Sequence, residues 1–267
     1  MAGSGDIADF TPDQLERYAR HIILPDVGGA GQTALMRASA LVVGAGGLGA
    51  PIIQYLAAAG LGRLVVIDDD AVDLSNLQRQ VIHATPDVGR NKAENAAAVV
   101  GRLNPEIQVE VHAERLTVVN VLELLDGCDV ALDGSDNFAT RYLLNDACWL
   151  AGVPLVSAAL LRFEGQLFVS AGAPQPCYRC LFPEAPKAGT IPSCSQAGVF
   201  GALAGVMGAL QATEALKLIL GRGAPMAGRF LLYDALDARF TEIKAMRNPD
   251  CPLCGDAPTI RDLSLHG

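Results

Sequence analysis

The feature that most constrains the fold of this chain is an apolar segment interrupted by glycines, ALVVGAGGLGAPIIQYLAAAGLGRLVVIDDD, at residues 40–70. Its pattern predicts a buried strand, a glycine loop that opens a helix, and a second buried strand that ends at Asp68. The glycines expected around a ligand are Gly44, Gly46, Gly47 and Gly49. A G-x-G-x-x-G in this setting lets backbone N–H groups approach phosphates, while the Asp68 carboxylate is placed to bind a ribose. We therefore predict a nucleotide site, with a dinucleotide cofactor or an unliganded turn as alternatives.

Alternation of strand and helix continues beyond this segment. The expected elements are helix 91–103, strand 107–112, helix 117–125, strand 128–132, helix 137–151 and strand 154–158. After residue 160 the pattern changes to two extended runs, 162–171 and 229–244, separated by a Pro-rich stretch and a helix at 197–220. These patterns predict a Rossmann-like, doubly wound α/β fold with a largely parallel sheet and a C-terminal antiparallel extension.

The chain contains neither an internal repeat nor a long linker, so we expect a single domain over residues 1–267. Its expected parts are an N-terminal helical arm at 10–38, a nucleotide-binding core at 39–160, and a partner-binding and metal-containing extension at 161–255. Thr11 and Gln14 predict a capping box at the start of the arm. The Pro-rich stretch PEAPKAGTIP, at 183–192, predicts a mobile surface loop.

Composition excludes several classes of partner. The net charge of −9 argues against a broad nucleic-acid surface, because phosphate binding requires clustered Lys and Arg. The apolar stretch at 198–210 is shorter than the ~20 residues that a membrane span requires, so we interpret it as a buried helix. The first residues lack the basic and apolar regions of a secretory signal. We therefore expect a cytoplasmic protein, without a membrane partner, whose cysteines stay reduced.

Polar residues beside the glycine loop favour a triphosphate over a dinucleotide. The run DDDAVDLSNLQRQ places Asn76 and Arg79 shortly after Asp68, and Lys92 opens a later helix. Arginine binds phosphate oxygens through a bidentate fork and lysine adds a compact charge, so both would stabilise a leaving pyrophosphate. The alternative is that Arg79 and Lys92 are ordinary solvated charges.

Acidic residues follow the strand expected at 128–132. The sequence DGSDN places Asp133 and Asp136 near the edge where open α/β sheets bind ligands. Mg²⁺ is commonly held by one or two carboxylates together with phosphate oxygens. These residues therefore predict a magnesium site. The alternative is that Asp136 caps the helix at 137–151.

Two C-x-x-C pairs predict a metal site. The pairs are Cys177 with Cys180 and Cys251 with Cys254. Four thiolates in two such pairs suit a closed tetrahedral zinc site, although the fold must bring the pairs together across ~70 residues. A redox role for one pair is the alternative. Cys128 and Cys148 lie in strand and helix patterns and are expected in the core.

Several motifs together resemble one enzyme family. They are the GAGGLG loop, the D-x-D-x-V-x-x-S-N-L-Q-R-Q run at 68–80, the helix begun by Lys92, S-D-N at 135–137 and RYARHI at 17–22. From about residue 10 to residue 255, the chain resembles the MoeB/ThiF-type adenylyltransferases, which are relatives of the ubiquitin-activating enzymes. These enzymes activate the sulfur carriers of molybdopterin and thiamine synthesis. The chain is most similar to the molybdopterin type, with the thiamine type as the alternative.

This resemblance implies adenylylation by ATP of the terminal Gly-Gly carboxylate of a small ubiquitin-like carrier, which gives an acyl-adenylate and pyrophosphate. The groups that it implies are ATP, Mg²⁺ and a structural Zn²⁺. The roles that it implies are ribose binding by Asp68, phosphate binding by Asn76, Arg79 and Lys92, and magnesium binding by Asp136. Arg20 would act in the partner's site of a homodimer. Little general-base chemistry is required, because a carboxylate is already ionised at neutral pH.

The resemblance leaves the role of Cys194 open. In the thiamine type the matching cysteine links covalently to the carrier, whereas in the molybdopterin type a separate enzyme delivers the sulfur. Cys194 is therefore either a thiolate nucleophile near a helix start or a dispensable residue. The chain ends soon after Cys254 without a rhodanese-like domain, so we expect a separate sulfurtransferase.

Two other hypotheses, an NAD-dependent oxidoreductase and a zinc-containing adaptor, compete with the adenylyltransferase. The oxidoreductase would explain the glycine loop but lacks a recognisable catalytic acid. The histidines, at positions 21, 83, 112 and 266, form no ligand spacing or triad, and we assign them no role.

Overall fold

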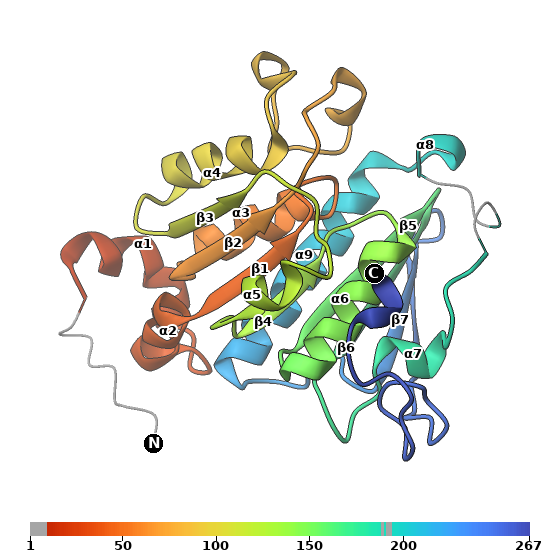
Figure 1. Ribbon diagram of the computed structural model, residues 1–267. Coiled ribbons are helices and arrows are strands. Elements are labelled where there is room, and N and C mark those ends of the chain that lie inside the picture. Colours follow the sequence, from red (N-terminus) through yellow and green to blue (C-terminus); the bar gives the residue numbers. More distant parts are fainter. Residues whose placement is uncertain (1–9, 188–189, 191–193) are drawn as a thin grey trace.

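The structure of the protein is a computed structural model that describes residues 10–187, 190 and 194–267, apart from the side chains at 194 and 195. The described strands form an eight-stranded sheet in the order β3-β2-β1-β4-β5-β6-β7-β8 (Figure 1). Their bounds are β1 Ser39–Val43, β2 Arg63–Ile67, β3 Gln108–His112, β4 Val130–Asp133, β5 Leu155–Leu161, β6 Glu164–Ser170, β7 Arg229–Asp234 and β8 Arg239–Lys244. The first five strands are parallel, and β6, β7 and β8 extend the β5 edge in antiparallel fashion. The predicted fold class is confirmed.

Helices cover both faces of the parallel strands. Their bounds are α1 Pro12–Ile22, α2 Gly28–Arg37, α3 Gly49–Ala59, α4 Lys92–Leu103, α5 Val121–Leu125, α6 Phe138–Ala151, α7 Tyr178–Leu181, α8 Cys194–Ala197 and α9 Gly201–Leu220. Figure 1 shows helices on both sides of the sheet. Side chains of α3, α4 and α9 share one apolar core with Val42 of β1, whereas those of α5 and α6 share another with Leu41. Neighbouring residues of β1 serve both cores because successive side chains of a strand point to opposite faces.

The N-terminal arm lies far from the glycine loop. Gln14 and Thr11 exchange the two hydrogen bonds of a capping box at the start of α1, which confirms the predicted cap. Tyr18 of α1 packs against Gly60, the residue that ends α3, and its hydroxyl accepts a hydrogen bond from Asn104. Because α3 rises about 16 Å along its length, α1 lies at the opposite end of α3 from the glycine loop.

The helix predicted at 117–125 is wrong in its first half, because within this range only α5, Val121–Leu125, is helical. Asn120 accepts a hydrogen bond from the Thr117 N–H and donates another to the Arg115 carbonyl. These bonds close a turn over residues 115–120. A local turn of this kind competes with helix hydrogen bonding, so the helix starts only after Asn120.

Two further predictions are corrected after residue 160. The helix predicted at 197–220 begins only at Gly201, as α9. Gly198, with a φ of +78°, and Val199, which bridges to Arg162, separate it from α8. The run predicted at 229–244 is a hairpin of β7 and β8. The Pro-rich stretch lies partly outside the described residues, so its character as a mobile loop stays a prediction.

Within the described residues, α9 is the one helix long and apolar enough to cross a membrane. It packs instead against α3 and the sheet, where Met207 is fully buried. The side-chain amide of Gln211 donates hydrogen bonds to the carbonyls of Asp133 and Val156. These contacts identify α9 as a core helix, as predicted.

Candidate functional site

The glycine loop connects β1 to α3 at the carboxyl end of the parallel strands. Gly44 has a φ of +91°, and a Cβ there would lie 2.9 Å from the carbonyl oxygen of Gly134. A Cβ on Gly49 would lie 1.9 Å from the carbonyl oxygen of Gly44. Only glycine fits these two positions, because backbone packs directly on backbone. No described side chain caps α3, and the Ala50 N–H donates to the Gly46 carbonyl at 2.9 Å, so the positive end of the helix dipole is open to an anion through the remaining N–H groups of the loop.

A cavity of about 670 Å³ opens beside this loop, a volume typical of small-molecule sites. It lies beyond the carboxyl end of β1. The strand order reverses at this point, because β2 lies on one side of β1 and β4 lies on the other. Open α/β sheets bind their ligands at such a switch point. The predicted residues that the structure brings together on its wall are Gly44, Gly46, Gly47, Asp68, Arg79, Lys92 and Asp136.

Arg79 and Lys92 place positive charge on the wall beside the glycine loop. Lys92 opens α4, as predicted, and its side chain is buried with Nζ 2.6 Å from an Asp70 carboxylate oxygen. The Arg79 guanidinium donates to the Ser75 carbonyl at 3.1 Å, which orients it along the loop. Lys92 is therefore no ordinary solvated charge, and the two cations can face an anion held by the loop.

Asp68 supports the loop as well as the cavity. Its Oδ2 accepts a hydrogen bond from the Ala45 N–H at 2.7 Å, and its Oδ1 accepts one from the Asp70 N–H at 2.9 Å. Burial raises the pKa of Asp68, and these two hydrogen bonds oppose that rise. Each carboxylate oxygen has a second lone pair, so a ribose hydroxyl can still donate to Asp68.

The two acidic residues after β4 have different environments. Asp133 is fully buried, pairs with Arg141 at 2.9 Å and accepts hydrogen bonds from Ser135 and Ser157, so its carboxylate is already occupied. Asp136 is exposed at the cavity, where a hydrated cation can reach it. The proposed cap role of Asp136 is wrong, because Asn137 caps α6 through the Thr140 N–H.

Gly49 and three other predicted site residues, Asn76, Arg20 and Cys194, are not among the described residues that line the cavity wall. Asn76 lies in the turn ahead of Arg79, where its side chain accepts from the Asp73 N–H. Arg20 lies exposed on α1, far from the glycine loop of its own chain. The side chain of Cys194 falls outside the described residues.

The wall away from the glycine loop was not predicted. Its polar and aromatic residues include Tyr142, Glu164, Gln166, Tyr178 and Phe182. Glu164 and Gln166 alternate along β6 and so share one face, which is a signal that the sequence does carry. The aromatic residues come from α6, from α7 and from Phe182 just after α7. Because α6 and α7 are distant in sequence, only tertiary packing brings these residues together. Gln80, within the SNLQRQ run, also lines the cavity and was overlooked.

The four cysteines of the two C-x-x-C pairs form one cluster. All four sulfur atoms lie within 4.8 Å of one another, and the Sγ atoms of Cys180 and Cys254 are 3.2 Å apart. Tetrahedral thiolate ligands at ~2.3 Å from zinc would place their sulfur atoms about 3.8 Å apart. The cluster therefore fits a metal ion of this kind. Cys128 and Cys148 lie in the core, as predicted.

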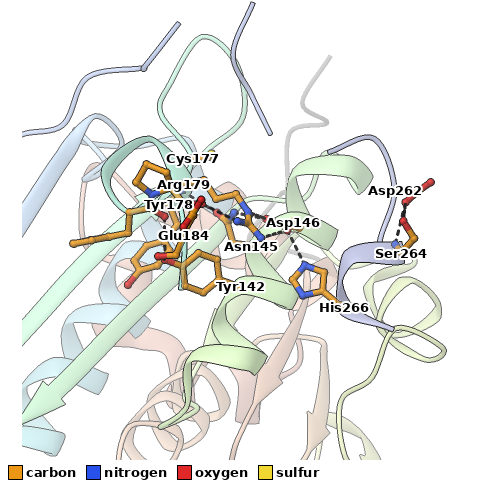
Figure 2. A network of polar contacts seen from close by, with 12 residues as sticks. Tyr142, Asn145, Asp146, Cys177, Tyr178, Arg179, Glu184, Asp262, Ser264 and His266 are labelled. Atoms are coloured by element: carbon orange, nitrogen blue, oxygen red, sulfur yellow. Dashed lines mark hydrogen bonds and ion pairs between the residues drawn. The ribbon is translucent and has the colours of Figure 1, made fainter. Parts of the chain in front are cut away.

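A buried polar network connects the cysteine cluster to the cavity wall (Figure 2). Asp146 of α6 is fully buried and accepts two hydrogen bonds of 2.7 Å from Arg179, which lies between Cys177 and Cys180. The Arg179 guanidinium also covers the ring of Tyr142, 4.7 Å from its centroid. Burial raises the pKa of Tyr142 to about 12, so its hydroxyl stays protonated and donates to backbone carbonyls.

Known proteins resemble this chain over nearly its whole length. The ThiF family matches residues 18–253. The SAMP-activating enzyme E1 of Haloferax volcanii is 56% identical over 245 residues, covering 91% of this chain and 90% of that protein. The sulfur carrier protein adenylyltransferase of Thermus thermophilus is 53% identical over 259 residues, covering 95% and 96%. The adenylyltransferase and sulfurtransferase MOCS3 of Bos taurus is 50% identical over 257 residues, which cover 96% of this chain but 56% of MOCS3.

Among solved structures, that of E. coli MccB with AMPCPP and MccA has a TM-score of 0.81. It covers 94% of this chain and 76% of the MccB chain at 22% identity, which shows the shared fold alone. The sheet, the glycine loop and the cavity thus define a doubly wound domain with a site for a nucleotide. The chain belongs to the ThiF family. It is an adenylyltransferase, as the sequence motifs predict.

Proposed function

We propose that the protein adenylylates the C-terminal carboxylate of a small ubiquitin-like sulfur carrier ending in Gly-Gly, with ATP as the donor. The observation that carries this proposal is the position of Arg79 and Lys92 on the cavity wall beside the glycine loop. A triphosphate brings more negative charge than loop N–H groups alone neutralise, so the two cations suit ATP. Relatives named as adenylyltransferases of a sulfur carrier support the choice of acceptor.

In the proposed reaction a carboxylate oxygen of the carrier attacks the α-phosphorus of ATP. The new P–O bond forms while the bond from the α-phosphorus to the oxygen bridging to the β-phosphorus breaks, and pyrophosphate leaves. The acceptor is already ionised at neutral pH, so the chain need not remove a proton. Its contribution is orientation by the glycine loop and Asp68, and charge stabilisation by Arg79 and Lys92. Asn76 would bind the phosphates from the turn that precedes Arg79.

Two metal ions complete the proposal. Asp136 would hold Mg²⁺, because its carboxylate is exposed at the cavity and that of Asp133 is occupied by Arg141. Bound Mg²⁺ would neutralise phosphate charge. The four cysteines of the cluster would hold a structural Zn²⁺, which the spacing of their sulfur atoms supports.

We assign the carrier to molybdopterin synthesis, with the thiamine carrier as the alternative. The identity to MOCS3, named as both adenylyltransferase and sulfurtransferase, favours the first pathway. We further propose that a separate sulfurtransferase delivers the sulfur to the acyl-adenylate. In that pathway Cys194 is dispensable for adenylylation. A Cys194→Ala variant should therefore retain carrier-dependent exchange, and loss of exchange in the folded variant would indicate covalent chemistry.

The test of this function is exchange of labelled pyrophosphate into ATP in the presence of purified carriers. We expect exchange that requires Mg²⁺ and a carrier ending in Gly-Gly, and none with the same carrier shortened by its last glycine. Comparison of the molybdopterin and thiamine carriers at equal concentration identifies the pathway. Absence of exchange with every Gly-Gly carrier, in protein that binds Mg-ATP, would contradict the proposal.

We also propose that Arg20 acts in the site of the partner subunit of a homodimer. Its exposed position on α1, far from the glycine loop of its own chain, supports action in trans. An arginine supplied in trans stabilises phosphate charge and changes rates by ~10³ or more in comparable enzymes. The homodimers Arg20→Ala and Asp136→Asn should each be nearly inactive.

Subunit mixing tests this assignment. A mixed dimer of the two variants contains one site with both residues intact, so activity should recover towards half of the wild-type value. Formation of mixed dimers is measured by mass spectrometry. If they form and activity stays at the level of the parents, Arg20 acts within its own chain.

A further inference from the structure

The backbone of Ala45, inside the glycine loop, is held from two sides. Its N–H donates to the Asp68 carboxylate at 2.7 Å, and its carbonyl oxygen lies 2.9 Å from Nε2 of His83. Both Ala45 and the His83 side chain are buried, with His83 5% exposed. His83 does not line the described cavity wall, whereas the next loop residue, Gly46, does.

The contacts of His83 define which ring nitrogen carries the proton. A carbonyl oxygen only accepts, so the contact with Ala45 requires a hydrogen on Nε2. Nδ1 lies 2.8 Å from the amide nitrogen of Asn95, which only donates, so Nδ1 carries a lone pair. The second amide hydrogen of Asn95 is directed to Asp87 at 3.3 Å, which fixes the orientation of the amide. His83 is therefore neutral, with its proton on Nε2.

This arrangement determines where the next N–H of the loop points. In a trans peptide the C=O and N–H bonds point in opposite directions. His83 holds the Ala45 carbonyl on the buried side, so the Gly46 N–H of the same peptide points away from His83, towards the cavity. His83 lies four residues after Arg79 and hydrogen-bonds through its backbone to Gln80. It therefore connects the loop to the segment that carries the phosphate-facing arginine.

We propose that His83 is a positioning residue of the nucleotide site, which aims the Gly46 N–H at a phosphate by holding the Ala45 carbonyl, with Asn95 selecting the Nε2–H tautomer. This inference rests on the proposed ATP-dependent function. It assigns His83 no contact with the substrate and no proton transfer. Its role is instead structural. A chain of hydrogen bonds from Asp87 through Asn95 and His83 to Ala45 joins α4, and the turn before it, to the glycine loop.

The test compares two substitutions of similar size that differ in whether they keep a hydrogen-bond donor. In His83→Gln, the side-chain amide keeps an N–H donor near the position of Nε2, whereas His83→Leu keeps the bulk and removes the donor. Calorimetry should show Mg-ATP binding weakened about tenfold in His83→Leu, the effect of one misdirected hydrogen bond, and by less than about threefold in His83→Gln. In pyrophosphate exchange, KM for ATP should follow the same order, while KM for the carrier stays within about twofold of the wild type.

A spectroscopic readout is independent of activity. Nitrogen-15 NMR of the histidine-labelled wild type should show a neutral ring protonated at Nε2, and Asn95→Leu should reduce the preference for that tautomer. Wild-type affinity in folded His83→Leu, or a ring protonated at Nδ1 in the wild type, would overturn the inference. If His83→Leu does not fold, the wild-type tautomer still decides. Normal Mg-ATP binding without carrier-dependent exchange would instead contradict the proposed function and leave the role of His83 intact.

Discussion

Two regions of the molecule differ in how their residues are brought together. The nucleotide end contains the glycine loop and the cavity, and the cysteine end contains the two C-x-x-C pairs. The predicted phosphate- and ribose-binding residues of the nucleotide end all come from one stretch, 44–92, in which a backbone turn and short hydrogen bonds hold the glycine loop. The cysteine cluster instead joins two knuckles whose members Cys177 and Cys251 are 74 positions apart. Its surrounding apolar cluster is small, with Leu253 and Trp149 among its members.

This difference indicates at which end the stability of the fold depends on a bound group. At the nucleotide end, Asp68 and His83 hold the glycine loop through hydrogen bonds to Ala45, so the fold itself shapes the site that ATP would enter. At the cysteine end, four thiols stand close together, and a metal ion is the group that can turn this proximity into a bonded crosslink. Substitutions at the nucleotide end should therefore affect activity, and those at the cysteine end should affect stability.

Of the substitutions that compare the two ends, Asp136→Asn should have the largest effect. The exposed carboxylate forms no hydrogen bond or ion pair with the described residues, whereas loss of one interaction with the transferring phosphates costs about 10²- to 10³-fold in comparable sites. We expect pyrophosphate exchange to fall by that factor and the melting temperature to stay within about 2 °C of the wild type. Asp237→Asn, which changes another exposed carboxylate at the β7–β8 turn, is the control and should retain exchange. Exchange above a tenth of the wild-type rate in Asp136→Asn would remove this residue from the magnesium site.

The sequence predicted the nucleotide end far better than the cavity as a whole. A few neighbouring residues were enough to predict the glycine loop, the position of Asp68 and the helix that begins at Lys92. Hydrophobic periodicity and turn-forming residues act over such short distances. The cysteine pairs were predicted from their spacing, but their junction with Asp146 and Arg179 depends on the packing of α6 against α7. The helix start near Asn120 was predicted wrongly, because hydrophobic periodicity does not show the side-chain hydrogen bonds that Asn120 makes to the backbone.

The second expected effect, of intermediate size, is that of Cys251→Ala. Wild-type protein should contain about one zinc per chain, and the variant less than half of that, because a closed site needs all four thiolates. We expect a melting temperature lower by about 5 °C, which corresponds to ~2 kcal/mol for a chain of this size. Cys148→Ala removes a buried thiol outside the cluster and should leave the metal content unchanged. Equal zinc content in both variants would contradict a site made by Cys251.

The smallest expected effect is a pH dependence that originates at the nucleotide end. Burial lowers the pKa of His83 from its ordinary value of 6.5, and the positive charge of Lys92 acts in the same direction. The Ala45 carbonyl and Asp87 oppose this shift, and Lys92 is itself paired with Asp70. The folded protein therefore keeps His83 neutral at a pH where the unfolded chain protonates it.

The sign of the effect on stability follows from proton uptake. Above about pH 6.5 the imidazole is neutral in both states, so the contribution of His83 to the free energy of unfolding is fully present. As the pH falls below that value, the unfolded state binds a proton that the folded state excludes, and this contribution is lost until the lowered pKa is passed. In urea unfolding at about pH 7.5 and about pH 5.5, the wild type should lose more stability on acidification than His83→Gln, whose side chain does not titrate. An equal loss in the two proteins would show that His83 is protonated as readily in the fold as outside it, and that its ring is not held in the neutral form that the Ala45 and Asn95 contacts require.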